Sequence, residues 1–233
     1  MQKRTQLDII LPVYNERYSI EQVVRDWYRA LRPLVSPRFI VCEDGSTDGT
    51  KEVLVHLAQK FPLTLDSQQS RRGYGKAVVR GIERATSEFV LCVDTDGQYD
   101  PEDFQKLWNK RLLTPVIVGV RTTRADPVHR HLYSGFFRCL FQILFHAQAR
   151  DPSSPFVLFR RTTVLPILPY LGFLTEGFWW GFSGVCIQKD LRVAEVPVHH
   201  RRRTTGTHLF TFSNIPGIAL RNIFGLIRLR ASL

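Results

Sequence analysis

The sequence predicts an α/β fold in which a mostly parallel central sheet lies between layers of helices. Three short apolar runs, residues 7–13, 39–42 and 89–93, are each followed by an acidic loop and then by a stretch with helical periodicity. Strands that alternate with helices pair in parallel, because each helix carries the chain back to the edge where the strand began. The 233 residues, of which 44% are hydrophobic, are enough for one globular domain with a sizeable core. The same composition excludes disordered, collagen-like and disulfide-scaffold proteins.

Each of the three units places a loop at the carboxyl end of its strand. After the first run, Ser19 and Glu21 are typical of a capped helix start, so we expect a helix that ends near Leu31. The second and third runs continue through the acidic loops 43–50 and 94–101 into further helices. In a parallel sheet such loops face one crevice, where ligands bind. We therefore expect the three acidic loops to form one site.

Two amphipathic helices are predicted in the second half of the chain, at about residues 129–149 and 214–229. The first repeats every fourth residue in three rows: Leu132, Phe136, Leu140, Leu144; Tyr133, Phe137, Phe141, Phe145; and Ser134, Arg138, Gln142, His146. Neither stretch reaches about 20 uninterrupted apolar residues, so neither is expected to span a bilayer. Two interpretations remain open: the helices lie in a lipid headgroup layer with their arginines on phosphates, or their apolar rows close the core.

The cysteines indicate a reducing compartment. Cys42, Cys92, Cys139 and Cys186 each stand alone in an apolar segment, without a C-x-x-C pair, so we expect four small core residues. No secretory signal is expected at the N-terminus, because Asp8 interrupts the first apolar stretch. These features favour a cytoplasmic protein.

The net charge of +11 is concentrated in the second half of the chain. Residues 1–127 carry 19 basic and 17 acidic side chains, whereas residues 128–233 carry 13 basic and 4 acidic ones and six of the seven histidines. An anionic partner is the simplest explanation: nucleic acid, an anionic membrane surface or a phosphorylated substrate. A basic surface that serves only solubility is the fourth interpretation.

Asp94 and Asp96 form a D-x-D motif where the third apolar run opens into its loop. Two carboxylates at this distance repel each other unless a cation lies between them. A hard divalent ion fits, because Mg²⁺ takes one or two protein carboxylates and keeps positions free for phosphate oxygens. The same motif also occurs as a simple capped turn, but Gln98 and the neighbouring acidic loops favour the metal site.

Two further loops suit a nucleotide. Asp44 stands where a carboxylate accepts a hydrogen bond from a base or a ribose hydroxyl, and Gly45 allows a ligand to approach the backbone. Residues 71–76 form a basic, glycine-rich loop at the start of a helix, in which Gly73 and Lys76 are suited to a diphosphate. Taken singly, both loops also have the composition of ordinary turns that cap helices.

Together these motifs resemble the family 2 glycosyltransferases, and most of all the dolichol-phosphate mannose synthase branch with its bacterial polyprenyl-phosphate relatives. The resemblance extends over nearly the whole chain, through residues 11–16, 43–50, 72–75, 93–98, 118–121, 151–156, 177–178, 195–198 and 203–206. It implies a GT-A fold, a three-layer α/β/α nucleotide-sugar-binding fold with C-terminal amphipathic interface helices. It also implies a GDP- or UDP-hexose donor and an Mg²⁺ or Mn²⁺ ion held by Asp94, Asp96 and Gln98.

Further site residues follow from the resemblance alone. Those expected to line the nucleotide pocket are Pro12, Tyr14, Glu16 and Asp44, and those expected to meet phosphate groups of donor or acceptor are Arg121, Arg130, Ser134 and Arg203. One domain, 1–233, is expected, with a nucleotide-sugar and metal half at 1–127, an acceptor half at 128–210 and an amphipathic helix at 211–233. The protein is expected to lie on the cytoplasmic face of a membrane, alone or with a membrane-anchoring partner.

The expected reaction is transfer of mannose or glucose to a polyprenyl or dolichyl phosphate with inversion. A cation at Asp94 and Asp96, with Arg121 nearby, stabilises the charge that grows on the departing diphosphate. A lipid phosphate is already ionised at pH 7 and needs no general base. If the acceptor is instead a sugar hydroxyl of a glycan, Glu176 is the candidate base, although an acid at a helix N-terminus is also favoured by the dipole. A nucleic-acid-binding module is disfavoured, because the acidic loops repel phosphate and no zinc-finger spacing or RNA-binding motif is present.

Overall fold

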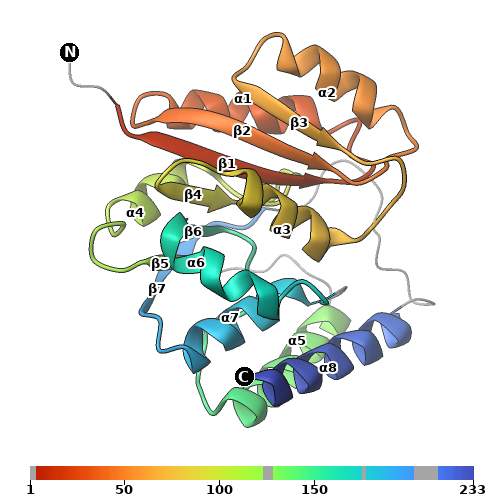
Figure 1. Ribbon diagram of the computed structural model, residues 1–233, viewed down its shortest axis with the longest axis vertical. Coiled ribbons are helices and arrows are strands. Elements are labelled where there is room, and N and C mark those ends of the chain that lie inside the picture. The colour runs from red at the N-terminus through yellow and green to blue at the C-terminus, as the bar shows by residue number, and fades with distance from the viewer. Residues whose placement is uncertain (1–3, 123–127, 175–176, 202–214) are drawn as a thin grey trace.

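The fold is built around one seven-stranded sheet. The structure is a computed structural model that describes residues 4–122, 128–174, 177–201 and 215–233, and within these it describes only the backbone of residues 128–134 and 215–216. The strands are β1 (Gln6–Val13), β2 (Ser36–Glu43), β3 (Leu63–Ser67), β4 (Phe89–Cys92), β5 (Val116–Arg121), β6 (Val157–Arg160) and β7 (Val193–Val198). Their order across the sheet is β3-β2-β1-β4-β6-β5-β7 (Figure 1).

All strands except β6 run in the same direction. Strands β2 and β4 pair in parallel with β1, and β3 pairs in parallel with β2. Strand β6 pairs antiparallel with both β4 and β5, so β5 points the same way as β4, and β7 is parallel to β5. The carboxyl ends of β1, β2, β4, β5 and β7 therefore share one edge. The predicted mostly parallel sheet is confirmed, and strands from both predicted halves of the chain belong to it.

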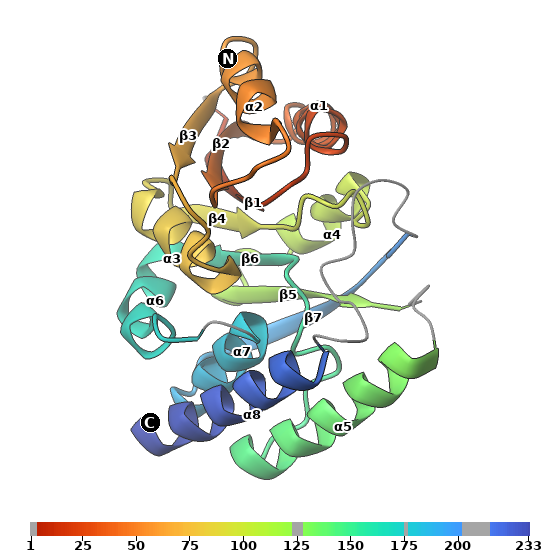
Figure 2. The same cartoon turned by 90° about the vertical axis from the view of Figure 1, so that its right-hand side faces the viewer.

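Helices cover both faces of the sheet (Figures 1 and 2). One core cluster joins α1, α2 and α4 to one face, and the second joins α3, α6, α7, α5 and α8 to the other. The helices are α1 (Ile20–Leu31), α2 (Thr50–Ala58), α3 (Tyr74–Arg84), α4 (Phe104–Trp108), α5 (Val128–Phe145), α6 (Arg161–Val164), α7 (Phe178–Gln188) and α8 (Ile215–Ser232). Two 3₁₀ segments, η1 (Pro101–Asp103) and η2 (Leu165–Tyr170), precede α4 and follow α6. The predicted three-layer arrangement is thus observed.

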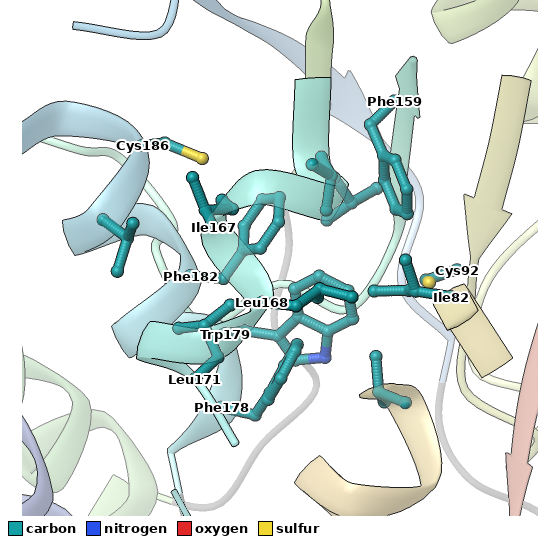
Figure 3. Packing of buried hydrophobic residues seen from close by; sticks show 14 of the residues in the cluster. Ile82, Cys92, Phe159, Ile167, Leu168, Leu171, Phe178, Trp179, Phe182 and Cys186 are labelled. Atoms are coloured by element: carbon teal, nitrogen blue, oxygen red, sulfur yellow. The ribbon is translucent and has the colours of Figure 1, made fainter. Parts of the chain in front are cut away.

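The second core cluster contains an aromatic group from α7. Figure 3 shows Phe178, Trp179 and Phe182 packed beside Leu168 and Leu171 from η2 and the turn after it. The ring centroids of Trp179 lie 5.1 Å from those of Phe178 and 5.4 Å from those of Phe182, in edge-to-face contact. This packing holds the start of α7 firmly against the sheet.

Helices α5 and α8 lie side by side at the end of the molecule remote from α2 (Figures 1 and 2). The Arg230 guanidinium donates a hydrogen bond of 2.9 Å from Nε to the Leu144 carbonyl. Both helices were predicted, and their apolar side chains fall into a buried set and an exposed set. One set is buried in the core: Phe137, Phe141, Phe145, Leu226 and Leu229. Another is exposed: Phe136, Ile143, Leu220, Phe224 and Ile227. Among the described residues, no helix has the length and hydropathy needed to cross a membrane.

Two local predictions were wrong. Ser19 precedes α1, but its hydroxyl donates to the Glu16 carboxylate rather than capping the helix, because Glu16 lies buried beside it. Cys139 is exposed on α5, whereas Cys42, Cys92 and Cys186 are buried. On α5, Phe137 and Phe141 take the positions that face the core, and Cys139 lies with Arg138 on the exposed side. Burial raises the pKa of the Cys42 and Cys186 thiols to about 12, so both stay protonated as core residues.

Candidate active site

The loops at the shared edge of the sheet are hydrogen-bonded to one another. The Thr95 hydroxyl donates to the Pro12 carbonyl at 3.1 Å, which ties the D-x-D loop to the end of β1. The Asp44 amide donates to the Val13 carbonyl at 2.9 Å and brings the second acidic loop alongside. On the other side, the Gln98 carbonyl accepts a 2.7 Å bond from the Arg201 amide, just after β7. The three acidic loops thus form one site, as predicted.

Asp94 lies in the middle of this edge with an excess of negative charge around it. Burial and the neighbouring Asp96 carboxylate raise its pKa from 3.8 to about 7, and Glu16 acts in the same direction. A hydrogen bond from the Tyr74 hydroxyl, 2.7 Å from Asp94 Oδ1, and the charge of Arg121 lower that pKa, but they do not compensate fully. The negative charge around Asp94 therefore favours the binding of a cation at this position.

The donor set fits a hard divalent cation. Asp94 and Asp96 offer carboxylate oxygens at the mouth of the site, and both side chains are half-buried. In the described part of the chain, no group of three or more acidic, histidine or cysteine side chains is arranged to hold a metal ion without other ligands. Two carboxylates are nonetheless the usual protein share for Mg²⁺, since substrate phosphates and water complete its shell. Gln98, the third predicted ligand, donates from Nε2 to the Arg201 carbonyl at 2.9 Å, so its side chain also joins the D-x-D loop to the segment after β7.

Asp44 holds the glycine-rich loop in place. Its carboxylate accepts hydrogen bonds from the Arg72 amide at 3.1 Å and from the Gly73 amide at 2.7 Å. These two amides are therefore directed at Asp44, and the suitability of this loop for a diphosphate stays a prediction. Gly45 has a φ of +75°, and a Cβ there would lie 2.5 Å from the backbone of Ser70. Glycine is required because the two loops touch through their backbones.

Tyr14 and Arg71, from the first acidic loop and the glycine-rich loop, pack against each other on the β1 side of the site. The Arg71 guanidinium lies 4.3 Å from the centre of the Tyr14 ring, in a cation–π arrangement that leaves a flat, positively charged surface. Glu16 is buried at the end of the same loop, and its amide donates to the Thr50 hydroxyl at 2.9 Å. Pro12 is the second-to-last residue of β1, and its carbonyl accepts the hydrogen bond from Thr95. Lys76 is exposed on the first turn of α3.

Arg121 is held by a buried acid. Its Nε and Nη2 atoms donate to the two carboxylate oxygens of Asp151, both at 2.7 Å, and Nη2 also donates to the Ser153 hydroxyl at 2.7 Å. The guanidinium therefore lies at the edge of the site in a fixed orientation and acts on Asp94 through its charge. Its predicted contact with a phosphate group stays a prediction.

Four predicted residues are not placed by the structure. Glu176 and Arg203 lie outside the described residues, and Arg130 and Ser134 belong to α5 in the part where only the backbone is described. Their assigned roles stay predictions.

Tyr74 and Trp179 were not among the predicted site residues, although Tyr74 contacts Asp94 and Trp179 contacts Tyr74. Tyr74 donates to Asp94, and Trp179 Nε1 donates to the Tyr74 hydroxyl at 2.7 Å. Trp179 is buried in the core, with its indole N–H directed at the Tyr74 hydroxyl. The only sequence signal was the position of Tyr74 inside the glycine-rich loop, because the Trp179–Tyr74 pair is separated by 105 residues.

Comparison with solved structures identifies the fold. Glucosyl-3-phosphoglycerate synthase from Mycobacterium tuberculosis, in complex with Mn²⁺, UDP-glucose and phosphoglyceric acid, superimposes with a TM-score of 0.70 at 20% identity, over 98% of this chain and 80% of that chain. Mannosyl-3-phosphoglycerate synthase from Rubrobacter xylanophilus gives a TM-score of 0.72 at 14% identity, over 98% of this chain and 75% of that one. The predicted GT-A fold is confirmed.

Sequence comparison identifies the family. The undecaprenyl-phosphate 4-deoxy-4-formamido-L-arabinose transferase of Salmonella choleraesuis is 25% identical over 219 residues, which cover 90% of this chain. The chain spans 64% of the length of that relative. Residues 8–164 match the family described as glycosyl transferase family 2. The resemblance drawn from the motifs is thereby confirmed: the chain belongs to glycosyl transferase family 2.

Proposed function

We propose that this chain transfers a hexose from a nucleoside diphosphate sugar to a polyprenyl phosphate, with a divalent cation held by Asp94 and Asp96. The observation that carries the proposal is the carboxylate pair at the strand edge, where the pKa of Asp94 is raised to about 7 by burial and by Asp96. The undecaprenyl-phosphate substrate in the name of the Salmonella relative supports the acceptor class. The Mn²⁺ and UDP-glucose bound by a protein of the same fold support the donor and the cation.

The proposed reaction is one displacement at the anomeric carbon. A phosphate oxygen of the lipid forms the new bond to that carbon as the bond to the nucleoside diphosphate breaks, so the configuration inverts. Mg²⁺ or Mn²⁺, when bound, neutralises the charge on the departing diphosphate. The Arg71–Tyr14 surface binds the nucleotide, and Arg121 adds fixed positive charge at the edge of the site. No base is required, because the acceptor phosphate is ionised at neutral pH.

A thermal-shift panel tests the donor class and the cation together. We expect the melting temperature to rise with either UDP-sugars or GDP-sugars, and to rise more when Mg²⁺ or Mn²⁺ is present, because a ligand that binds only the folded state stabilises it. At a concentration of about 100 times the dissociation constant the gain is about 2.7 kcal/mol. A chelator should remove the metal-dependent part of the shift. No shift with any donor in the presence of either cation would contradict the proposal.

Transfer assays then separate the acceptor classes. The donor that gives the shift is incubated with undecaprenyl phosphate, with undecaprenol and with a free oligosaccharide. Product with undecaprenyl phosphate alone supports the lipid phosphate as acceptor. Product with the oligosaccharide alone would favour the alternative, transfer to a sugar hydroxyl.

Helices α5 and α8 are the proposed membrane-facing surface. On α8 the exposed Leu220, Phe224 and Ile227 recur at helical spacing, and the exposed Arg221 and Arg228 flank them. At an anionic membrane surface, the exposed apolar side chains would enter the acyl-chain region, and the arginines beside them would bind the headgroup phosphates. This arrangement brings a lipid acceptor to the enzyme at the membrane surface.

Phe224→Glu should weaken binding to lipid vesicles that contain phosphatidylglycerol by about tenfold or more. Phe224 is 67% exposed, so its contribution to binding is the transfer of an aromatic side chain into lipid, roughly 1.5–3 kcal/mol. Vesicle co-sedimentation measures the change. Leu112→Glu is the matched control, because Leu112 is 71% exposed on the turn after α4 and the new charge is the same. Equal losses in both variants would show that added negative charge, and not the α8 surface, causes the effect.

A further inference from the structure

A chain of two hydrogen bonds joins helix α7 to the carboxylate pair. Trp179 Nε1 lies 2.7 Å from the Tyr74 hydroxyl, which lies 2.7 Å from Asp94 Oδ1. An indole nitrogen can only donate, so the Tyr74 oxygen accepts from Trp179. The single hydroxyl proton is then free to be donated to Asp94. The indole thus fixes the direction of both bonds.

The surroundings of Tyr74 and Trp179 maintain the direction of these two hydrogen bonds. A tyrosine phenol carries its proton at neutral pH, so the Tyr74 hydroxyl can donate to Asp94. Trp179 is 5% exposed, and Figure 3 shows its ring within the cluster formed by Phe178, Phe182 and Leu168. A ring packed in this way has one available rotamer. The donor is therefore held in place without a contribution from solvent.

The backbone near α3 and α7 is packed equally closely. A Cβ at Gly75 would lie 2.6 Å from the Leu174 carbonyl oxygen and 3.2 Å from the Phe178 ring. Residue 75 directly follows Tyr74, so this contact fixes the start of α3 against the segment that leads into α7. The distance between the phenol and the indole is consequently set by main-chain packing and not by flexible side chains.

We propose that Tyr74 and Trp179 are positioning residues that orient Asp94 for the cation. The hydrogen bond on Oδ1 fixes the plane of the carboxylate and leaves Oδ2 for the metal. This inference rests on the proposed function, because it requires that Asp94 binds a cation. Groups that hold a metal ligand in this way commonly change metal affinity by 10- to 100-fold when they are removed.

Binding of Mn²⁺ alone, followed by the electron paramagnetic resonance signal of the free ion, tests the proposal without any turnover. Tyr74→Phe should raise the Mn²⁺ dissociation constant about tenfold, and Trp179→Phe should raise it by a smaller factor. In the Tyr74→Phe background, Trp179→Phe should have no further effect, because no hydroxyl remains to transmit it. Trp180→Phe and Tyr28→Phe are the controls: Trp180 packs on Phe137 and Phe141, Tyr28 packs on Phe61, and both should bind Mn²⁺ as the wild type does.

The outcomes distinguish the inference from the function on which it rests. If Asp96→Asn abolishes Mn²⁺ binding but Tyr74→Phe leaves it unchanged, the positioning role is wrong and the metal site stands. If Asp96→Asn has no effect on Mn²⁺ binding, the metal site and the positioning role are both wrong. If Trp179→Phe raises the Mn²⁺ dissociation constant by the same factor in the wild type and in Tyr74→Phe, Trp179 does not act through the Tyr74 hydroxyl. The loss of affinity would then come from altered packing. If Trp179→Phe does not fold, the Tyr74→Phe titration alone decides.

Discussion

Asp96→Asn should reduce the rate of sugar transfer by at least about a hundredfold while the protein stays folded. The substitution removes one of two carboxylates proposed to hold the cation, and even residues that only support a metal ligand change activity by 10- to 100-fold. The fold should tolerate it, because Asp96 Oδ1 accepts a 3.0 Å bond from the Gln98 amide and the oxygen of asparagine can do the same. Removing a like charge beside Asp94 also relieves the repulsion that raises the pKa of Asp94.

Initial rates in the presence of Mg²⁺ or Mn²⁺, and melting temperatures in metal-free buffer, check this expectation together. The melting temperature of Asp96→Asn should equal or slightly exceed that of the wild type. Glu102→Gln is the matched control, since Glu102 is an exposed carboxylate on the turn after the same loop. It should keep full activity. Wild-type activity in Asp96→Asn would remove the carboxylate pair from the mechanism.

The parallel part of the fold was predictable because its signals are local. Each apolar run, its loop and the following helix are adjacent in the sequence, and repeated strand–helix units usually form a parallel sheet. The antiparallel β6 was not predictable in the same way. Residues 157–160 form a short apolar run, and its direction depends on the edge to which the chain returns after α5, which no local pattern specifies.

The site was predictable to the extent that its residues follow strands. Asp94, Asp96 and Asp44 come directly after apolar runs, so their convergence followed from parallel topology. The side chains and amides that contact the site residues could not be predicted in this way. Arg121 is paired with Asp151, 30 residues away, and Asp44 accepts hydrogen bonds from the amides of Arg72 and Gly73 in the glycine-rich loop. Such pairings depend on how loops from separate units meet, and composition alone does not contain that information.

Asp8 is a charged residue inside a buried strand, and hydrogen bonds from neighbouring elements compensate for its burial. It interrupts an apolar run, and its carboxylate is completely buried in β1. Arg38, its register partner on β2, donates to both carboxylate oxygens at 2.8 Å, and the amides of Thr86 and Ser87 donate at 2.6 and 2.9 Å. Burial raises the pKa of Asp8, but these hydrogen bonds outweigh it, so the pKa lies below 3.8. One carboxylate thus joins β1, β2 and the turn before β4.

Asp8→Asn should therefore lower the free energy of unfolding by about 3 kcal/mol at pH 7, because it leaves buried donors without an acceptor. A carboxyl whose pKa is lower in the folded state stabilises the protein above its unfolded pKa, and this contribution disappears as the pH falls through the folded pKa. The difference from the wild type should consequently be constant near neutral pH and shrink below about pH 4. Urea unfolding across this range measures it. Asp26→Asn is the control, because Asp26 pairs with Arg29 on the surface of α1, and it should change stability by less than about 0.5 kcal/mol. Equal losses in the two variants would mean that the Asp8 cluster does not stabilise the junction of the three elements.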